Sequence, residues 1–210
     1  MKTMKYAALI LLASIGGAAL GASYSVVKEE SVIGVVVRKA GPLSAMAHNH
    51  FIYAGDYEVV EAFDPESASG VVVFNHQDLI NDEHSTTMRY SADIQSRGIV
   101  NEEFAELSQD DRNTIRGHML AGDQLGQGEI TVKFVGFTGE KANIEMTVKG
   151  VSVVKEVEAV FEQDESTASL SVTGPFLFSD FGIKPYSAFG GLLRNKDEFY
   201  VYGRFYLKAN

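Results

Sequence analysis

The sequence contains no cysteine and no tryptophan among its 210 residues. Without cysteine, a disulfide framework, a thiol nucleophile, cysteine-ligated zinc and an iron–sulfur cluster are all excluded. Basic residues are also scarce, since 18 Lys and Arg stand against 28 Asp and Glu and give a net charge of −10. Binding to phosphate backbones requires a surplus of positive charge, so this balance argues against nucleic acid and against electrostatic docking on anionic lipid.

The start of the chain predicts a secretory signal peptide. Lys2 and Lys5 are followed by an apolar stretch and then by small residues up to Ala22, which is the layout of a cleaved export signal. We therefore assign residues 1–22 to the signal and residues 23–210 to the mature chain. Loss of the two lysines makes the mature net charge −12.

Beyond this segment, apolar and polar residues alternate with a period of two, which is typical of strands with one face on a core. Alternating segments lie at residues 51–59, 87–94, 130–134, 143–149, 169–178 and 199–208, and shorter β-branched runs at 32–37, 71–74 and 151–160. Gly, Asp and Asn separate the segments, and no linker or repeat divides the chain. The pattern predicts one all-β domain, either an antiparallel sandwich or a barrel.

One segment, residues 101–120, breaks the alternation and predicts a helix of about three turns. Ser108 precedes Gln109, Asp110 and Asp111, which resembles a capping box with acids where the helix dipole favours negative charge. The sequence therefore predicts a single helix inserted among the strands.

His48 and His50 are the first candidates for chemistry. In a strand both imidazoles point to the same face, which suits a pair of metal ligands. The spacing of the other histidines and acids specifies no third ligand. The other interpretation, which the missing third ligand favours, is two polar groups at a strand entrance that contact backbone or the polar end of a ligand.

Motifs of the common enzyme classes are missing. The Asp-Phe-Gly triplet at 180–182 matches a kinase motif, but no Gly-rich loop or catalytic loop accompanies it. Residues 126–128 lack the third glycine of a dinucleotide loop, and the sequence contains no nucleophile elbow. We therefore expect a protein that is not an enzyme and has no cofactor.

Aromatic residues are abundant for a chain without tryptophan, with 13 Phe and 9 Tyr. If about eight strands close into a barrel, side chains either fill the interior or leave room for one ligand. An aromatic, apolar interior suits a hydrophobic ligand with a few polar groups at the mouth. Composition alone leaves both a filled and a hollow barrel open.

Several segments of the mature chain resemble the YceI family of exported lipid-binding proteins. They are residues 47–65, 107–134, 147–161 and 178–209. The first is similar to the family's Gly-His-x-His stretch, with Ala47 in place of the usual glycine. The second is similar to its acidic helix and following strand, with Gly126 and Gly128 where proline is frequent. The last contains the Asp-Phe-Gly-Ile-Lys-Pro pattern of one branch of the family.

The resemblance implies an eight-stranded antiparallel, lipocalin-like β-barrel with one short helix insertion. It implies a periplasmic, non-catalytic carrier whose tunnel holds a long isoprenoid chain, such as a polyprenyl lipid or a quinone tail. Burial of such a chain is favourable by about 25 cal/mol per Å² of apolar surface. We expect no nucleic-acid partner and no stable membrane insertion, and the oligomeric state stays open, a homodimer included.

Strand alternation selects the residues expected at the site. The expected lining consists of Phe51, Tyr53, Met88, Tyr90, Phe134, Met146, Phe176 and Phe178. The expected contacts to a polar head group are His48, His50, Arg89 and Lys184. These choices depend on the face that each strand turns inward, because a shift of one residue exchanges the two faces.

Two other functions stay open on the sequence. A metal- or haem-associated periplasmic enzyme would use His48 and His50 as ligands. A small outer-membrane barrel would present apolar bands to lipid, and the helical insertion is awkward for such a span.

Overall fold

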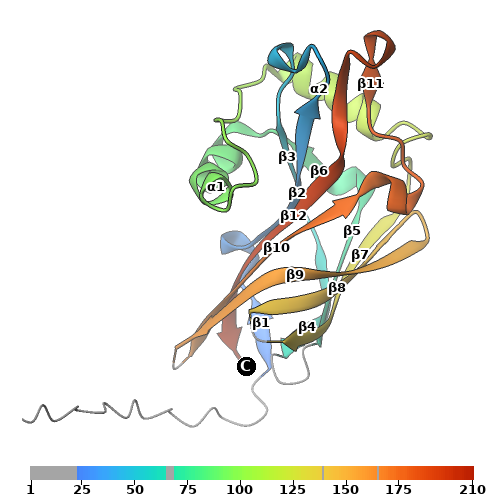
Figure 1. Cartoon of the computed structure of the whole chain (residues 1–210). Coiled ribbons are helices and arrows are strands. Elements are labelled where there is room, and N and C mark those ends of the chain that lie inside the picture. Colours follow the sequence, from blue (N-terminus) through green and yellow to red (C-terminus); the bar gives the residue numbers. More distant parts are fainter. Residues whose placement is uncertain (1–22, 65–68, 139, 165) are drawn as a thin grey trace, which may run out of the picture.

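The computed structural model describes residues 23–64, 69–138, 140–164 and 166–210 (Figure 1), so the predicted signal peptide lies outside the described residues. The strands are β1 (Tyr24–Val26), β2 (Val32–Ala40), β3 (His50–Ala54), β4 (Glu58–Asp64), β5 (Ser69–Asn75), β6 (Leu79–Asn81), β7 (Glu129–Thr138), β8 (Lys141–Val148), β9 (Val151–Gln163), β10 (Thr167–Leu177), β11 (Ser187–Ala188) and β12 (Leu193–Ala209). The α-helices are α1 (His84–Ser96) and α2 (Gln109–Met119). Short 3-10 turns are η1 (Lys28–Glu30), η2 (Ser44–Met46), η3 (His76–Asp78), η4 (Phe178–Phe181) and η5 (Phe189–Gly191).

Eight strands close into an antiparallel barrel in the order β1–β4–β5–β7–β8–β9–β10–β12, and β12 pairs back to β1. The pairing of β1 with β4 continues in the same register into the pairing of β2 with β3, because Tyr24 lies opposite Phe63 and Gly34 opposite Tyr53. β1 and β2 therefore act as one long strand interrupted by η1, and β3 and β4 act as the next. The predicted eight-stranded antiparallel barrel is confirmed.

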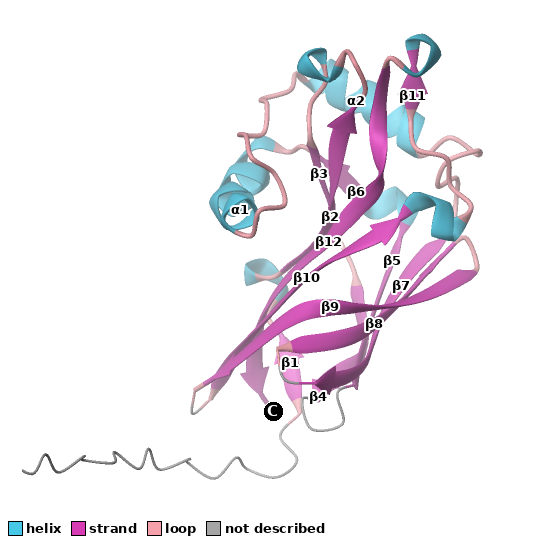
Figure 2. Cartoon of the chain, in the orientation of Figure 1, coloured by secondary structure: helices cyan, strands magenta, loops and turns pink. Residues whose placement is uncertain are grey.

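At one end, β2, β3 and β6 extend beyond the closed ring along the other half of β12. Figure 2 shows both α-helices toward this end, whereas the opposite end near the C-terminus is built of strands. α2 contacts β6. Paired strands thus form the complete ring at one end of the barrel, and helix and loops border the other end.

Phenylalanine rings fill the strand-built end. Phe63 packs against Phe134, Phe137 and Phe161, with ring centroids 5.6 to 5.8 Å apart, and Phe205 lies 6.4 Å from Phe134. Edge-to-face and offset contacts of this kind stabilise a core beyond the burial of area alone. We call these five residues the aromatic plug, because they close the interior at this end.

The strand predicted over residues 87–94 is wrong, since these residues belong to α1. The buried side chains of α1 are Thr87, Tyr90, Ser91 and Ile94, and this spacing of three and four residues is that of one helix face. The alternation of Met88, Tyr90, Ala92 and Ile94 shares the pair Tyr90 and Ile94 with that helical face. The structure therefore has two helices in the insertion where the sequence predicted one.

Glu83 sets the start of α1. Its carboxylate accepts hydrogen bonds from the backbone N–H groups of Ser85 and Thr86, at 3.1 and 2.9 Å. The bond from Thr86, added to those from Ser85, lowers the pKa of Glu83 to about 2. Ionised at neutral pH, it satisfies two of the free N–H groups that a helix start leaves.

The predicted cap of the other helix is confirmed. The Ser108 hydroxyl accepts a hydrogen bond from the Asp111 N–H at 3.1 Å, and α2 begins at Gln109, directly after Ser108. The helix is shorter than predicted, because residues 101–107 do not adopt helical structure. No helix in the described part of the chain is long and apolar enough to cross a membrane.

A second core lies outside the barrel, between α1 and the outer face of β2, β3 and β12. Phe51, Tyr90 and Tyr202 meet there with ring centroids 5.8 to 6.3 Å apart. The Tyr202 hydroxyl donates to Asp93 Oδ2 at 2.6 Å, and burial raises the Tyr202 pKa. This packing attaches α1 to the barrel wall.

Candidate binding cavity

The helix-bordered half of the barrel contains a cavity of about 340 Å³. Its walls come from β2, β3, β5, β7, β8 and β12, with η4 and α2 at the border. The apolar residues that line it include Ile33, Val37, Ile52, Phe74, Leu79, Ile130, Val132, Met146, Val148, Phe178, Phe181, Ile183, Phe199 and Val201. The interior is therefore hollow at one end and filled by the aromatic plug at the other.

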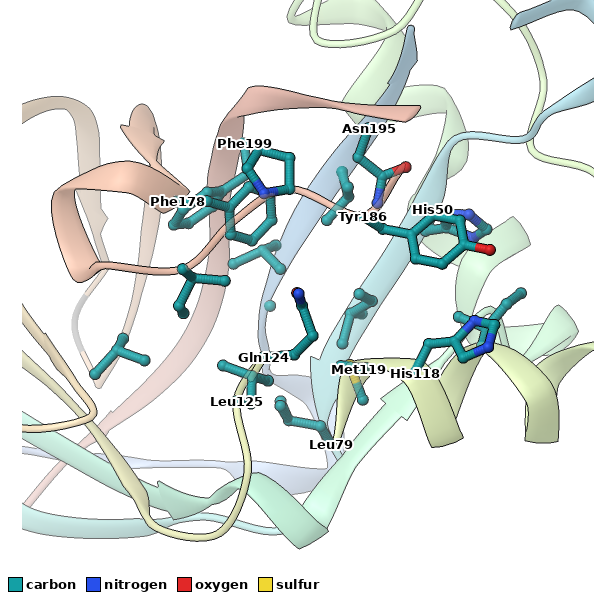
Figure 3. Close-up of a pocket in the computed structure, with 18 of the residues that line it drawn as sticks. His50, Leu79, His118, Met119, Gln124, Leu125, Phe178, Tyr186, Asn195 and Phe199 are labelled. Carbon is teal, nitrogen blue, oxygen red and sulfur yellow. The ribbon is translucent and has the colours of Figure 1, made fainter. Parts of the chain in front are cut away.

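The polar groups that line the cavity are all neutral side chains or histidines. They are His48, His50, Thr114, His118, Gln124, Tyr186 and Asn195. In Figure 3 the Gln124 side chain extends into the open space, and Asn195 points into it from β12. No Lys, Arg, Asp or Glu is among the described residues of the lining. A ligand in this cavity thus meets hydrogen-bonding groups without a fixed charge.

His50 is held by a buried carboxylate. Asp82 is 5% exposed, and its Oδ2 lies 2.8 Å from His50 Nδ1. Its Oδ1 accepts from the Phe51 N–H, while the Asp82 N–H donates to the Phe51 carbonyl, both at 2.9 Å. Because the carboxylate accepts, Nδ1 carries the proton, and Nε2 is the ring nitrogen left free for a ligand.

The mouth of the cavity lies beside α2. Its exposed lining residues include Met46, His48 and His118. The His118 ring stacks on Tyr186, with centroids 5.1 Å apart and an interplanar angle of 18°. This contact joins α2 to the segment between η4 and β11, so the two elements border the mouth together.

Polar contacts to backbone hold α2 in this place. The Arg116 guanidinium donates to the carbonyls of Leu79 and Gln77, and Asn81 Nδ2 donates to the Arg112 carbonyl at 3.2 Å. No residue of α2 is fully buried. The position of α2 over the cavity therefore depends more on these hydrogen bonds than on core packing.

The structure brings four of the predicted site residues to the cavity: Met146, Phe178, His48 and His50. Phe134 and Phe176 also lie inside the barrel. Phe134 belongs to the aromatic plug, and Phe176 packs behind the cavity wall against Phe181 and Phe199, at 6.2 and 6.1 Å.

The other predicted residues lie elsewhere. β3 turns His50 and Ile52 inward and Phe51 and Tyr53 outward, so the face predicted for this strand is the wrong one. Tyr90 packs with Phe51 under α1. Tyr53, Arg89 and Tyr90 border a separate outer hollow of about 170 Å³, Met88 is exposed on α1, and Lys184 is exposed between two lining residues.

Gln124 and His118 were not predicted at the site. Both come from α2 and the loop after it, whose position relative to the barrel has no signature in strand alternation. Asn195 had a local signal, because it lies two residues after Leu193 in β12 and the two side chains therefore share the inward face. The described residues include no group of three or more His, Asp or Glu that could hold a metal ion.

Comparison with solved structures finds this fold in bacterial proteins. The crystal structure of BcnA from Burkholderia cenocepacia is similar over 89% of this chain and 100% of that chain, with a TM-score of 0.53 at 14% identity. A crystal structure of Campylobacter jejuni YceI protein matches over 76% of this chain and 84% of that chain, with a TM-score of 0.47 at 16% identity. No protein-family model and no curated protein sequence matches the chain.

The fold and the cavity define a lipocalin-like β-barrel that is hollow at one end. The fold is similar to that of BcnA, and it is the eight-stranded antiparallel barrel that the resemblance of the sequence implied. At these identities the comparisons show the fold alone, so the ligand has to be argued from the cavity.

Proposed function

We propose that this protein is a non-catalytic binding protein that holds an isoprenoid chain in the barrel cavity. The observation that carries the proposal is an apolar cavity inside the barrel whose described lining has a few polar groups toward the mouth and no Lys, Arg, Asp or Glu. Apolar walls with a few orienting polar groups are the usual form of a site for a hydrophobic ligand. A methyl-branched chain fits walls built from Ile, Val, Leu and Phe.

The neutral lining favours a ligand whose polar end is uncharged, such as a quinone or an alcohol. Burying an ionised phosphate without a cation is costly. Neither cation predicted for the head group lines the cavity, since Lys184 is exposed outside the lining and Arg89 borders the outer hollow. His50 Nε2 can accept a hydrogen bond from a hydroxyl, and the amides of Gln124 and Asn195 can donate to a carbonyl.

The size of the cavity limits how much of the ligand is enclosed. A volume of about 340 Å³ is at the lower end of the range of ligand pockets, roughly 300 to 1,000 Å³. Because the aromatic plug closes the other end, a long chain would be enclosed only in part, with the remainder at the mouth. We propose that residues 1–22 export the chain to the periplasm, where such lipids are within reach.

The alternatives have less support. The bond from His50 Nδ1 to Asp82 is also usual for a metal-ligating histidine, but the described residues include no group of three or more His, Asp or Glu that could complete a ligand set. The outward faces of β7, β8 and β9 do expose valines such as Val154 and Val160, but charges interrupt them, so no continuous apolar band forms. These charges are Lys133, Lys141, Glu156 and Glu158. These charges favour water over lipid around the barrel.

The test is the identity of the molecule that co-purifies with the protein from its own host. Organic extraction followed by mass spectrometry should release a neutral isoprenoid in a stoichiometric amount. Leu125 lines the cavity and is only half-buried, so Leu125→Trp should fill the space and reduce the extracted lipid at least about tenfold without unfolding.

Val154→Trp is the matched control, because Val154 is 55% exposed on the outside of β9. It adds the same side chain and should leave the lipid content unchanged. Recovery of the native protein without lipid, or equal lipid in both variants, would refute the proposal. Osmotic-shock release and the N-terminal sequence of the mature protein test the export.

A further inference from the structure

The end of the molecule around the cavity mouth exposes large apolar side chains. Phe189 is 74%, Met46 73% and Leu192 47% exposed. Met46 lies in η2, and Phe189 and Leu192 lie in the connection from β11 to β12, so both segments stand at the same end in Figure 1. The Leu43 N–H donates to the Leu192 carbonyl at 2.9 Å and joins them. We call Met46, Phe189 and Leu192 the apolar rim, and Met46 also lines the cavity.

The backbone at Phe189 is unusual for an aromatic residue. Its φ is 51°, in the left-handed region, and Gly190 and Gly191 follow at 68° and 92°. Bulky side chains rarely adopt this conformation, for which glycine or asparagine is preferred. The chain therefore accepts backbone strain at a position where the ring gains little burial. Turn chemistry does not explain a phenylalanine here, whereas contact with an apolar phase outside the molecule does.

Positive charge accompanies the apolar rim. Residues 38–55 and 181–196 contain no Asp or Glu, and their cations are Arg38, Lys39, Lys184, Arg194 and Lys196. Arg38 and Lys39 are paired with Glu198 and Glu102. Lys184, Arg194 and Lys196 are exposed and form no ion pair with any residue that the structure describes.

α2 carries residues of both signs beside the mouth. Its acids, Asp110 and Asp111, are in the first turn, and Arg116 and His118 are in the last turn, where His118 borders the mouth. Exposed Asp123 follows in the loop after α2, so the surplus of positive charge lies in the rim segments themselves, with Lys184, Arg194 and Lys196. At physiological ionic strength charges are screened over about 8 Å, so a surface that meets the rim experiences these cations more than the distant acids.

We propose that the apolar rim docks on the surface of a lipid bilayer that contains anionic lipid. Phe189, Leu192 and Met46 would enter the boundary between head groups and acyl chains, with Lys184, Arg194 and Lys196 among the head groups. Apolar side chains flanked by cations are the composition of interfacial membrane-binding segments. The docking is peripheral and local, and it revises the expectation from total charge that the chain avoids anionic lipid.

A bilayer is favoured over a protein partner for two reasons. Three side chains are few for the roughly 1,200 Å² or more that a stable protein interface buries, whereas insertion into lipid needs no matching shape. The rim also lies at the end where the apolar cavity opens, and Met46 belongs to both. Docked in this way, the cavity opens toward the membrane, and a hydrophobic ligand enters it without crossing water.

Co-sedimentation with vesicles tests the proposal. The full mature protein should bind vesicles of phosphatidylcholine with phosphatidylglycerol, less strongly at high salt and less strongly on phosphatidylcholine alone. The double variant Phe189→Ser with Leu192→Ser should lose binding about tenfold or more on both vesicles. Replacing Lys184, Arg194 and Lys196 by Gln should abolish only the preference for phosphatidylglycerol.

Val154→Ser with Val160→Ser is the matched control, because both residues are exposed on the outside of β9, away from the mouth. This variant should bind vesicles like the wild type. Thermal unfolding checks that all variants fold, which the exposure of the substituted residues favours. Vesicle binding that is equal in wild type and rim variant would overturn the proposal, as would its absence in the wild type.

A concentration-dependent dimer that the rim variant abolishes, without vesicle binding, would assign the rim to a second copy and would also overturn it. The outcome is separable from the ligand proposal, because Leu125→Trp should empty the cavity but still bind vesicles. Lipid in the cavity without vesicle binding would refute only the docking.

Discussion

Asp82 determines how His50 presents itself to the cavity. The residue is buried, has a left-handed backbone with φ of 51°, and bonds both His50 Nδ1 and the Phe51 N–H. Asn is the substitution that keeps this backbone and the acceptor for Phe51, since it tolerates the left-handed region. Its NH₂ group, however, would face His50 Nδ1 and require that nitrogen to be an acceptor.

Asp82→Asn should therefore exchange the tautomer of His50. In the wild type at mildly alkaline pH we expect the proton on Nδ1, and in the variant on Nε2, which turns an acceptor toward the ligand into a donor. The ¹⁵N chemical shifts of the ring, measured by NMR, report the change directly. The same tautomer in both proteins would show that Asp82 does not set it.

Asp82→Ala is the disruptive counterpart. It leaves the Phe51 N–H and His50 without partners in a buried place, so it should lower the free energy of unfolding by about 2 to 4 kcal/mol.

The shared face of His48 and His50 could be predicted from their spacing. Asp82 could not, because it lies 32 residues away and reaches His50 only through the pairing of β3 with β6.

At the scale of elements, α2 lies over the cavity and is attached to the barrel mainly by hydrogen bonds. Arg116 donates to two carbonyls beside β6, and those bonds tie a helix with no fully buried residue to the barrel. A helix attached in this way separates from the barrel at a lower free energy than the barrel strands, because the pairing of the strands is continuous. Ligand exchange should follow the opening of this helix.

Arg116→Met keeps the aliphatic stem and removes these bonds. Amide hydrogen exchange of residues 109–119 should become faster, and unfolding stability should fall by about 1 kcal/mol, with faster ligand release. Arg112→Met is the control, because the Arg112 guanidinium contacts Gln109 in its own helix. Equal exchange rates in the two variants would contradict the role given to Arg116.

The two helices show where sequence patterns succeed and where they fail. Ser108 followed by acids is a local signal, and the structure places the cap of α2 there. α1 begins instead at Glu83, which is not a usual capping residue, and its buried pair Tyr90 and Ile94 also fits alternation by two. A short apolar pattern that satisfies both periods cannot distinguish strand from helix without knowledge of what packs on it.

At the scale of the whole molecule, side chains fill one half of the barrel interior, and the other half encloses the cavity. Alternation predicted strands with one buried face but left a sandwich and a barrel open, and the closed barrel was implied by the family resemblance. The division of the interior into a filled and a hollow half was not predicted. The aromatic plug joins Phe63 to Phe161 across the interior, and the distance of either ring from the mouth depends on strand tilt rather than on sequence spacing.

His76 connects this folded state to pH. It is fully buried in η3, its Nε2 has no partner among the described residues, and Nδ1 lies 3.4 Å from the Gly126 carbonyl. Burial lowers its pKa below the ordinary value of 6.5, opposed by the backbone carbonyl and aided by Lys149. The folded protein thus keeps this ring neutral where the unfolded chain would bind a proton.

The direction in which pH changes the folding stability follows from the number of protons that the folded and unfolded states bind. Between the lowered pKa and 6.5 the unfolded state holds more protons, so the stability contribution is complete above pH 6.5 and is lost as the pH falls below it. One such group changes stability by at most about 1.4 kcal/mol per pH unit. Urea unfolding of the wild type between pH 7.5 and 5.5 should show this decline, and His76→Leu, which cannot titrate, should show a smaller one. Because His50 and the exposed histidines are common to both proteins, the difference between their slopes isolates His76, and identical slopes would refute its role.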